Sequence, residues 1–535
     1  MENYKVTQSK EIDLIDLLSK NLSNLEVKEQ QMLRENLKDQ VEGRLFGQEL
    51  EFEPVKWIIN TLLKLLLKRI LYKKIIYQKV TYDSVNPQGK PCKLTGLVIF
   101  PKFSGSEISL PIIGYNHATQ MVRDLAPSCF NPAKPLNYME AIVGLFFAAQ
   151  YGFVVAMADY QGLGGNTDNM HPYVNGKPLA RSVLDLLDTT RAMVKNNNII
   201  WNNKLYLIGY SEGGYVTMAT SRTIQENPQY SAIYNIAASS PMGGPYSISE
   251  VMRFVMLRRE TFGDGYFLPM TLRGFNAVYG NDYDNRIFTK ERSLKPEWQF
   301  LWDMADGYHT PEEVNSKMPP IPGDILSDEI VSQLRDRNSL VYKALRENDL
   351  IKWQNKPAMP MHLYHAENDD RVPFENSIVI KDAFQVQGAD VPLVPMFHIP
   401  ELKSIHLGAA LPSFLEGYYW FASIRNMHKN TLQPGEYIVN GYWLDSPNKL
   451  YRLRFQMDSN LALYRMDTDV LLWETKTSFD QGKCLMQTDG NFAVYDNNFN
   501  VQWQTNTKGE GCVLSVLDSG TIEIRDKNGN VIWHS

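Results

Sequence analysis

The feature that most constrains the fold is an alternation of short apolar runs with longer helical stretches between residues 110 and 364. The apolar runs are Leu110–Tyr115, Phe153–Ala158, Lys204–Gly209, Tyr234–Ser239 and Pro360–Tyr364. The helical stretches are Met139–Tyr151, Leu179–Val194 and Gly214–Gln225. Continuous apolar strands separated by amphipathic helices are typical of a parallel sheet that is covered on both faces. The sequence therefore predicts an α/β fold for this part of the chain.

The N-terminal region, residues 1–69, has a different pattern and is predicted to be a helical segment. Charge-rich helices are expected over Glu11–Leu18 and Leu25–Val41. The stretch Trp57–Tyr72 is more apolar, but basic residues interrupt it, which argues against a membrane-spanning helix. We favour a helix on the body of the protein over one on a membrane surface, which would be a peripheral contact. The first residues lack the pattern of a signal peptide, so the sequence leaves the compartment open.

The rest of the chain divides into two further domains. Strands predicted over Lys73–Tyr82 and Cys92–Phe100 open an α/β domain that is expected to span residues 70–430. Within it, residues 240–349 break the alternation and are rich in Met and aromatic side chains, which predicts an inserted helical lid. Residues 432–535 have short strands, no helical period and many Asn, Asp and Trp residues, which predicts a separate all-β domain.

Composition excludes several classes of protein. A length of 535 residues predicts more than one domain, and 44% hydrophobic with 21% charged residues is the balance of a folded chain. A net charge of −6 gives no reason to expect a nucleic-acid partner. The four cysteines form neither a disulfide framework nor a zinc-ligand pattern, so we interpret them as free thiols. We predict no metal and no cofactor, and the oligomeric state is left open.

The segment Gly209-Tyr-Ser-Glu-Gly213 is a G-x-S-x-G motif. The motif alone is common by chance, but here it follows a predicted strand and precedes a predicted helix. A tight turn between these elements needs small residues on both sides of the serine, because a Cβ there would meet the neighbouring backbone. Such a turn lifts the hydroxyl out of the sheet at a helix N-terminus, which favours negative charge. Ser211 is therefore predicted to be a nucleophile.

A serine hydroxyl needs a base to take its proton and an acid to orient that base. Asp369 follows the strand that ends near Tyr364, and His406 lies in a loop before a helix predicted over Ala409–Phe421. The chain order Ser211, Asp369, His406 is the order that the strand–turn–helix nucleophile uses. We predict these three residues as a catalytic triad.

Other residues compete for the two partner roles. Asp370 is a close rival for the acid, and Glu367 is a weaker one because it lies nearer the strand. His398 is the main rival for the base, although its apolar surroundings favour a packed histidine.

An oxyanion hole requires two backbone N–H donors aimed at the developing charge. The first is expected from Glu212, directly after the nucleophile. The second is expected from the loop after the strand Leu110–Tyr115. There we assign Thr119, with Ala118 as the alternative.

Residues 70–425 resemble the secretory-lipase branch of the α/β-hydrolases. Besides the motif around Ser211, the chain has Asp159-Tyr-Gln-Gly-Leu-Gly-Gly165 followed by His171-Pro-Tyr173, segments similar to those of that family. The resemblance implies hydrolysis of acyl or lipid esters through an acyl-enzyme, with a helical lid between nucleophile and acid. Two features depart from the family: the missing signal peptide, and Glu212, which is expected to place a carboxylate near the mouth of the site.

The C-terminal region contains an internal repeat. Gln456-Met-Asp-Ser-Asn-Leu-Ala-Leu-Tyr464 recurs as Gln487-Thr-Asp-Gly-Asn-Phe-Ala-Val-Tyr495, and a third copy keeps only Asp518. A tryptophan follows each copy, at Trp473, Trp503 and Trp533. A fixed period is typical of a repeat fold, in which three small sheets would share a core filled by the tryptophans.

The repeated motif resembles that of bulb-type mannose-binding lectins, which form a three-fold β-prism. The resemblance implies that mannose-type glycans are bound by alternate side chains on one strand face, with Ala462 and Ala493 where the family has valine. The residues implied in sugar binding are Gln456, Asp458, Asn460, Tyr464, Gln487, Asp489, Asn491 and Tyr495. The third copy is not expected to bind.

These features favour a serine carboxylic-ester hydrolase, a lipase or esterase, that a lectin domain directs to glycans. Two alternatives stay open. A serine peptidase of the same fold would use the same triad. A glycan-binding protein with an inactive hydrolase domain would keep the lectin function alone.

Overall fold

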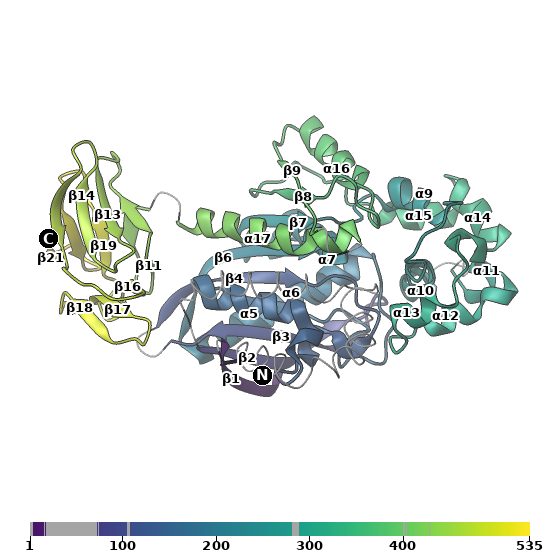
Figure 1. The fold of residues 1–535 in the computed structure, drawn as a ribbon, viewed down its shortest axis with the longest axis horizontal. Helices are drawn as coiled ribbons and strands as arrows, with labels where there is room; N and C mark the ends of the chain where they lie inside the picture. The colour runs from purple at the N-terminus through teal and green to yellow at the C-terminus, as the bar shows by residue number, and fades with distance from the viewer. Residues whose placement is uncertain are drawn as a thin grey trace.

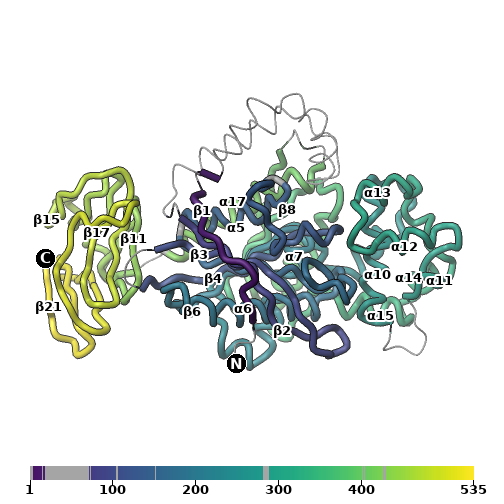
Figure 2. Tube along the Cα trace, turned by 90° about the horizontal axis from the view of Figure 1, so that it is seen from below, coloured from purple at the N-terminus to yellow at the C-terminus, as the bar shows by residue number. Residues whose placement is uncertain are grey.

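The computed structural model describes residues 4–14, 16–17, 72, 74–103, 107–280, 288–399, 402, 404–426 and 429–535. Over these residues the protein has three parts in a row: a cap of short helices, a central α/β domain, and a C-terminal unit of small sheets (Figure 1). The view from below gives the same order (Figure 2). No helix in these ranges is long and apolar enough to cross a membrane. The predicted helix Leu25–Val41 lies outside the described residues, as does Trp57–Tyr72 apart from its last residue.

The central domain is built on one nine-stranded sheet with the order β1-β2-β3-β5-β4-β6-β7-β8-β9. Strands β1, β2, β3 and β5 pair antiparallel, and the pairs from β5 through β4 to β9 are parallel. The bounds are β1 Tyr4–Asp13, β2 Lys74–Val85, β3 Pro91–Pro101, β4 Ile108–Asn116, β5 Val154–Ala158, β6 Ile199–Tyr210, β7 Ile236–Met242, β8 Leu363–His365 and β9 Leu393–Pro395. The predicted parallel sheet is present, and each apolar run overlaps one of its strands.

The prediction of a helix beginning at Glu11 is wrong, because β1 continues to Asp13. The segment Tyr4–Asp13 is polar and gives little strand signal by itself. It is held by antiparallel pairing along the length of β2, from Tyr4 with Tyr82 to Asp13 with Lys74. The Glu11 carboxylate also pairs with Lys74 and Lys102. Tertiary pairing thus overrides the local helical preference.

Helices cover both faces of the central sheet. On one face, α5 (Met139–Tyr151) and α17 (Ile405–Asn426) bury apolar side chains against β4, β5 and β6. On the other face lie α6 (Gly176–Val194), α7 (Glu212–Glu226) and α16 (Glu375–Val386). Strand β4 is buried along its whole length, as expected for a strand covered on both sides. A four-residue helix, α8 (Pro228–Ser231), links α7 to β7.

The cap is inserted between β7 and β8 and consists of short helices. Their bounds are α9 Arg253–Met256, α10 Phe267–Tyr279, α11 Lys290–Ser293, α12 Phe300–Met304, α13 Pro311–Asn315, α14 Asp328–Arg335 and α15 Leu340–Glu347, with a π-helical turn over Ile248–Met252. Several begin at a side-chain cap, such as the capping box of Thr310 and Glu313 before α13. The cap lies beyond the sheet edge where the parallel strands end (Figure 1).

The C-terminal unit consists of three four-stranded antiparallel sheets. The first sheet has the order β12-β13-β14-β15, the second β11-β16-β17-β18 and the third β10-β19-β20-β21. The bounds are β10 Thr431–Leu432, β11 Tyr437–Val439, β12 Trp443–Asp445, β13 Tyr451–Phe455, β14 Leu461–Arg465, β15 Val470–Glu474, β16 Gly482–Met486, β17 Phe492–Asp496, β18 Val501–Gln504, β19 Val513–Val516, β20 Ile522–Arg525 and β21 Val531–His534. One sequence repeat supplies the last three strands of each sheet.

The three tryptophans do not fill the core of this unit, so that part of the prediction is wrong. Leu, Ile, Val, Phe, Met and Cys side chains from all three sheets form the buried cluster. Trp473, Trp503 and Trp533 are only partly buried and meet one another edge to face, with ring centroids 5.5, 5.8 and 6.0 Å apart. They stabilise the junction of the three sheets through aromatic contacts.

The C-terminal unit docks where the parallel strands begin. The amide of Ser109, at the start of β4, donates to the carbonyl of Gly435 (2.8 Å). Gly152, just before β5, lies so close to Tyr437 that an added Cβ would be 2.4 Å from the Tyr437 hydroxyl. The unit and the cap therefore lie at opposite ends of the α/β domain (Figures 1 and 2).

Candidate active site

Ser211 lies at the turn between β6 and α7. Its backbone has φ 59° and ψ −122°, a conformation that is strained for a residue with a side chain. A Cβ added to Gly209 would be 2.3 Å from the carbonyl oxygen of Gly213, and one added to Gly213 would be 2.0 Å from that of Asn116. Only glycine fits at both positions. The G-x-S-x-G spacing is thus set by close backbone contact.

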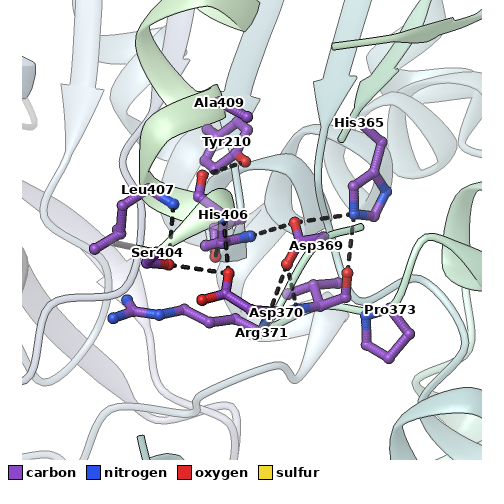
Figure 3. Close-up of polar contacts among 12 residues, drawn as sticks. Tyr210, His365, Asp369, Asp370, Arg371, Pro373, Ser404, His406, Leu407 and Ala409 are labelled. Atoms are coloured by element: carbon purple, nitrogen blue, oxygen red, sulfur yellow. Dashed lines mark hydrogen bonds and ion pairs between the residues drawn. The ribbon is translucent and has the colours of Figure 1, made fainter. Parts of the chain in front are cut away.

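Ser211, His406 and Asp369 form one chain of hydrogen bonds. His406 Nε2 lies 2.8 Å from Ser211 Oγ, and His406 Nδ1 lies 2.6 Å from Asp369 Oδ2. The three side chains come from the turn after β6, the loop after β8 and the start of α17. Figure 3 shows His406 pointing toward Asp369. This arrangement can take a proton from the serine and stabilise the resulting imidazolium.

Asp369 is held as a carboxylate by its surroundings. Burial alone would raise its pKa, but His406 and hydrogen bonds from His365 and His406 hold the pKa of Asp369 well below its usual value. Its Oδ1 also accepts the amides of Arg371 (2.9 Å) and Val372 (2.8 Å). His365 Nε2 lies 3.2 Å from Asp369 Oδ2 and 3.0 Å from the Val372 carbonyl oxygen, as Figure 3 shows. His365, at the end of β8, is thus an orienting partner of Asp369 that the sequence analysis did not identify.

The rival residues occupy other positions. Asp370 Oδ1 accepts the backbone amide of His406 (2.8 Å) and the hydroxyl of Ser404 (3.0 Å), so it holds the loop and not the imidazole ring. Glu367 is exposed. It is His406, and not His398, that bonds to Ser211.

The loop after β4 contains both candidates for the second oxyanion donor, the amides of Ala118 and Thr119. The Ala118 amide donates to both oxygens of Glu140, at 3.0 and 3.2 Å, so it is occupied. Within the described residues, the amides of Thr119 and Glu212 make no hydrogen bond. Thr119 lines the cavity next to Ser211, and its hydroxyl lies 3.3 Å from that of Tyr173. The geometry therefore favours Thr119 over Ala118.

The expected position of the Glu212 side chain is wrong. It was expected near the mouth of the site, but it is fully buried, and Glu212 Oε1 lies 2.8 Å from His171 Nε2. His171 Nδ1 lies 3.1 Å from the carbonyl oxygen of Gln161. The Asp159–Gly165 segment folds tightly, since a Cβ on Gly164 would be 2.0 Å from Asp159 Oδ2. The segment therefore contacts His171 through Gln161, and His171 holds the side chain of Glu212, which directly follows Ser211.

A cavity of about 500 Å³ opens beside Ser211 and His406. One wall is apolar and comes from α5 and α17. Its residues are Ala141, Val143, Leu407, Ala410, Leu411 and Phe414. The opposite wall comes from the cap and includes Tyr266, Phe267 and Tyr308. Such a cavity has the size and apolar lining of a small-molecule site.

A buried ion pair ties the cap to the loop that carries Asp369. Arg371 Nε lies 2.8 Å from Asp264 Oδ2. Burial raises the pKa of Asp264, and the charge of Arg371 opposes that effect. Both residues line the cavity, so the cap and the loop that carries Asp369 meet in its wall.

Within the described ranges, no group of three His, Cys, Asp or Glu side chains has the arrangement of a metal site.

The first repeat presents its predicted sugar-binding residues on the outer face of the first sheet. Asp458 is exposed, and Gln456, Asn460 and Tyr464 are partly exposed. Gln456 Nε2 donates to the Tyr464 hydroxyl (2.8 Å), and Asp458 Oδ1 accepts the Asn460 amide (3.0 Å). The four residues thus form a preorganised polar row, called here the first row.

The second row, formed by the equivalent residues of the second repeat, is largely covered. Gln487 is 8% exposed and Tyr495 is 7% exposed. Tyr495 packs edge to face against Phe103 of the α/β domain, with ring centroids 6.3 Å apart. Asp489 is exposed and Asn491 is partly exposed. The expectation of two accessible rows is therefore wrong, because Gln487 and Tyr495 of the second row are buried, Tyr495 against the α/β domain.

A buried lysine lies at the centre of this contact. Lys483 Nζ lies 4.0 Å from the ring centroids of Tyr72 and Phe499 and 4.9 Å from that of Phe103. Lys483 is fully buried, and its Nζ has no hydrogen-bond partner among the described residues. Burial lowers the pKa of Lys483 well below its usual value.

In the third repeat, Asp518 accepts the backbone amide of Asn448 and so has a structural contact.

Comparison with known proteins identifies the fold of the central domain. Residues 142–255, which include Ser211, match the sequence profile of the Prolyl oligopeptidase family. The rice cell wall degrading esterase LipA from Xanthomonas oryzae superimposes with a TM-score of 0.55 at 21% identity, over 69% of this chain and 94% of that chain. The central domain has the α/β-hydrolase fold. The predicted fold class of this domain is thereby confirmed.

Two relatives are similar in sequence over parts of the chain. Lipase A from Moesziomyces aphidis is 22% identical over 326 residues, which are 57% of this chain and 62% of that protein. A mannose-specific lectin from Dendrobium findlayanum is 39% identical over 69 residues, which are 12% of this chain and 39% of the lectin. The chain thus spans less than two thirds of the length of either relative.

Proposed function

We propose that the protein is a serine carboxylic-ester hydrolase that uses Ser211, His406 and Asp369 as its catalytic triad. The observation that carries this proposal is the unbroken chain of short contacts from Ser211 Oγ through His406 to Asp369, at the wall of a largely apolar cavity. Similarity to a lipase and to an esterase supports an ester as the substrate.

The proposed reaction passes through an acyl-enzyme. Ser211 Oγ attacks the ester carbonyl carbon while its proton moves to His406 Nε2, and the amides of Glu212 and Thr119 hold the oxyanion. The bond to the alcohol oxygen breaks, and His406 gives its proton to the departing alcohol. Water then attacks the acyl group, its proton passing to His406, and the acid leaves as Ser211 regains its hydrogen.

The apolar wall favours an acyl chain over a polar acid group. Leu407, Ala410, Leu411 and Phe414 lie on one face of α17 and line the cavity together with Val143 of α5. An alkyl chain placed between these helices would leave water, which contributes about 0.8 kcal/mol for each buried methylene. We therefore propose lipid-like esters as the preferred substrates, and the cap as the lid over them.

We further propose that the C-terminal unit is a β-prism lectin domain that binds mannose-type glycans through its first row. The similarity to a mannose-specific lectin and the preorganised contacts of Gln456, Asp458 and Tyr464 support this role. The unit docks where the strands begin, whereas Ser211 follows the end of β6. The lectin domain thus acts as an anchor at the far end from the cavity and raises the local concentration of substrate.

A serine peptidase is the second candidate, because the matching family profile is that of prolyl oligopeptidases. One assay separates the two functions: p-nitrophenyl esters of graded acyl length compared with prolyl p-nitroanilides. The proposal predicts ester hydrolysis that becomes faster from acetate to longer chains, and no cleavage of the anilides. Cleavage of the anilides without ester hydrolysis would establish the peptidase instead.

A further inference from the structure

Glu140 is a carboxyl group in the wall of the cavity that the proposed reaction does not use. It lies in the first turn of α5, where a helix N-terminus stabilises negative charge. Its oxygens accept the Ala118 amide at 3.0 and 3.2 Å, and Oε1 lies 3.3 Å from the hydroxyl of Tyr115 at the end of β4. One carboxyl group therefore joins α5, β4 and the loop that follows it.

Asn116 and His117, which precede Ala118, are held by partners other than Glu140. Asn116 Nδ2 donates to Thr217 Oγ1 of α7 (2.9 Å), and the His117 ring stacks on Tyr160 with centroids 4.0 Å apart. These contacts are made by side chains. Among the residues that the structure describes, the Ala118 amide has an acceptor, Glu140, and the Thr119 amide has none.

This contact bears on which amide can face the reacting ester. Successive amides of an extended or turning loop point in different directions, so fixing the Ala118 amide toward α5 restricts the direction of the Thr119 amide. A loop free to rotate could instead turn Ala118 toward Ser211. A shift of about 1 Å in a catalytic group is enough to reduce a rate roughly 100-fold.

We propose that Glu140 is a positioning residue that accepts the Ala118 amide and thereby directs the Thr119 amide to the oxyanion formed at Ser211. The inference rests on the proposed ester hydrolysis and adds to it the residue that sets the second oxyanion donor. Burial raises the pKa of Glu140, although His117 and the hydrogen bond from Ala118 oppose that effect.

The test compares Glu140→Ala with Glu140→Gln, using a p-nitrophenyl ester and a boronic acid that mimics the tetrahedral intermediate. Glutamine keeps an oxygen that can accept the Ala118 amide. Glu226→Ala is the matched control, because Glu226 also accepts a backbone amide, that of Gln354 (2.7 Å), but does not line the cavity. Thermal unfolding of each variant reports whether the fold is intact.

In Glu140→Ala we expect kcat to fall roughly 100-fold with KM changed less than about threefold, and boronate affinity to fall by a similar factor as kcat. Glu140→Gln should keep kcat within about fivefold of the wild type, and Glu226→Ala should behave like the wild type. If Glu140→Ala keeps its kcat, or changes only KM, the inference is overturned. A folded Glu140→Gln that is as slow as Glu140→Ala also overturns it, because acceptance of the amide would then not be the role. A wild-type protein that hydrolyses no ester would instead refute the proposed function itself.

Discussion

The Ser211 cavity and the C-terminal repeats both start from a short sequence motif, yet the structure treats the two regions differently. Around Ser211, residues from three distant segments come together in one hydrogen-bonded chain. In the C-terminal unit, two nearly identical motifs have different surroundings. The first row faces solvent, whereas Gln487 and Tyr495 of the second row are buried, and Tyr495 lies against Phe103 of the α/β domain.

The two regions differ because different factors determine where their residues lie. Strand order places the ends of β4, β6 and β8 at one edge of the sheet, so the loops that follow them must be neighbours. No such rule says what covers the outer face of a small sheet. One difference in residue character lies here: Leu485 occupies the place on the second sheet that Arg454 has on the first, and Leu485 packs into the apolar cluster of the α/β domain. An apolar side chain at that position suits a docking face.

The largest effect is expected from Ser211→Ala, which separates the two regions. Ester turnover should fall roughly 10⁶-fold, because the nucleophile is removed. Retention on a mannose column should stay unchanged, because the first row belongs to a different unit. The measurement is turnover and retention on the same preparation. A variant that loses both would show that the two sites are not independent.

The acid of the triad gives the next largest effect. Asp369→Asn should reduce kcat on the order of 10⁴-fold, because the imidazole loses its orienting carboxylate. Asp370→Asn should cost about tenfold or less, since Asp370 bonds the backbone amide of His406 and the hydroxyl of Ser404 and not the imidazole ring. Steady-state kinetics on one ester distinguishes them. The reverse order would transfer the role of acid to Asp370.

The two rows are compared directly by one matched pair of variants. Asp458→Asn should weaken retention on immobilised mannose roughly 10- to 100-fold, because the first row loses a charged hydrogen-bond acceptor. Asp489→Asn should leave retention unchanged, because Gln487 and Tyr495 beside it are covered. Ester turnover should be unaffected in both. Equal losses in the two variants would mean that the second row also binds.

The smallest effect concerns the docking face and depends on pH. Because burial lowers the pKa of Lys483, docking is strongest above the ordinary lysine pKa of about 10.4 and weakens as pH falls through the lowered value. Lys483→Met removes this charge and should raise Tm by about 2 °C at pH 6 and by less at pH 10. Tyr72, Tyr437, Tyr495 and Arg425 are the other titratable groups near this contact.

The control for this prediction is the equivalent residue of the exposed sheet. Arg452 pairs across the first sheet with Tyr464 as Lys483 pairs across the second with Tyr495. Arg452→Met should change Tm by an amount that does not differ between pH 6 and pH 10. If Lys483→Met shows no pH dependence either, the lysine does not weaken docking by its charge.

Much of the central fold could be predicted because its strands carry their own signal. Runs such as Leu110–Tyr115 are apolar along their whole length, and the helix Met139–Tyr151 has the bounds predicted for it. Strand β1 could not be predicted, because its polar residues become a strand only by pairing with β2. The residues of Tyr4–Asp13 alone do not indicate that this segment pairs with β2.

The candidate site was predictable to a similar degree. The motif around Ser211 and the chain order of Asp369 and His406 pointed to residues that the structure brings together. The sequence assigned Thr119 as the second oxyanion donor but left Ala118 as an alternative, because the contact of the Ala118 amide with Glu140 could not be predicted. The cover over Tyr495 depends in the same way on Phe103.

The central claim, that Ser211 is an activated nucleophile, is tested most directly by labelling with a fluorophosphonate and locating the adduct by mass spectrometry. The account predicts one adduct, on the peptide that contains Ser211, which forms in the wild type, is absent from Ser211→Ala and forms far more slowly in His406→Ala. A wild-type protein that takes up no label, or that is labelled on another serine, would contradict the account.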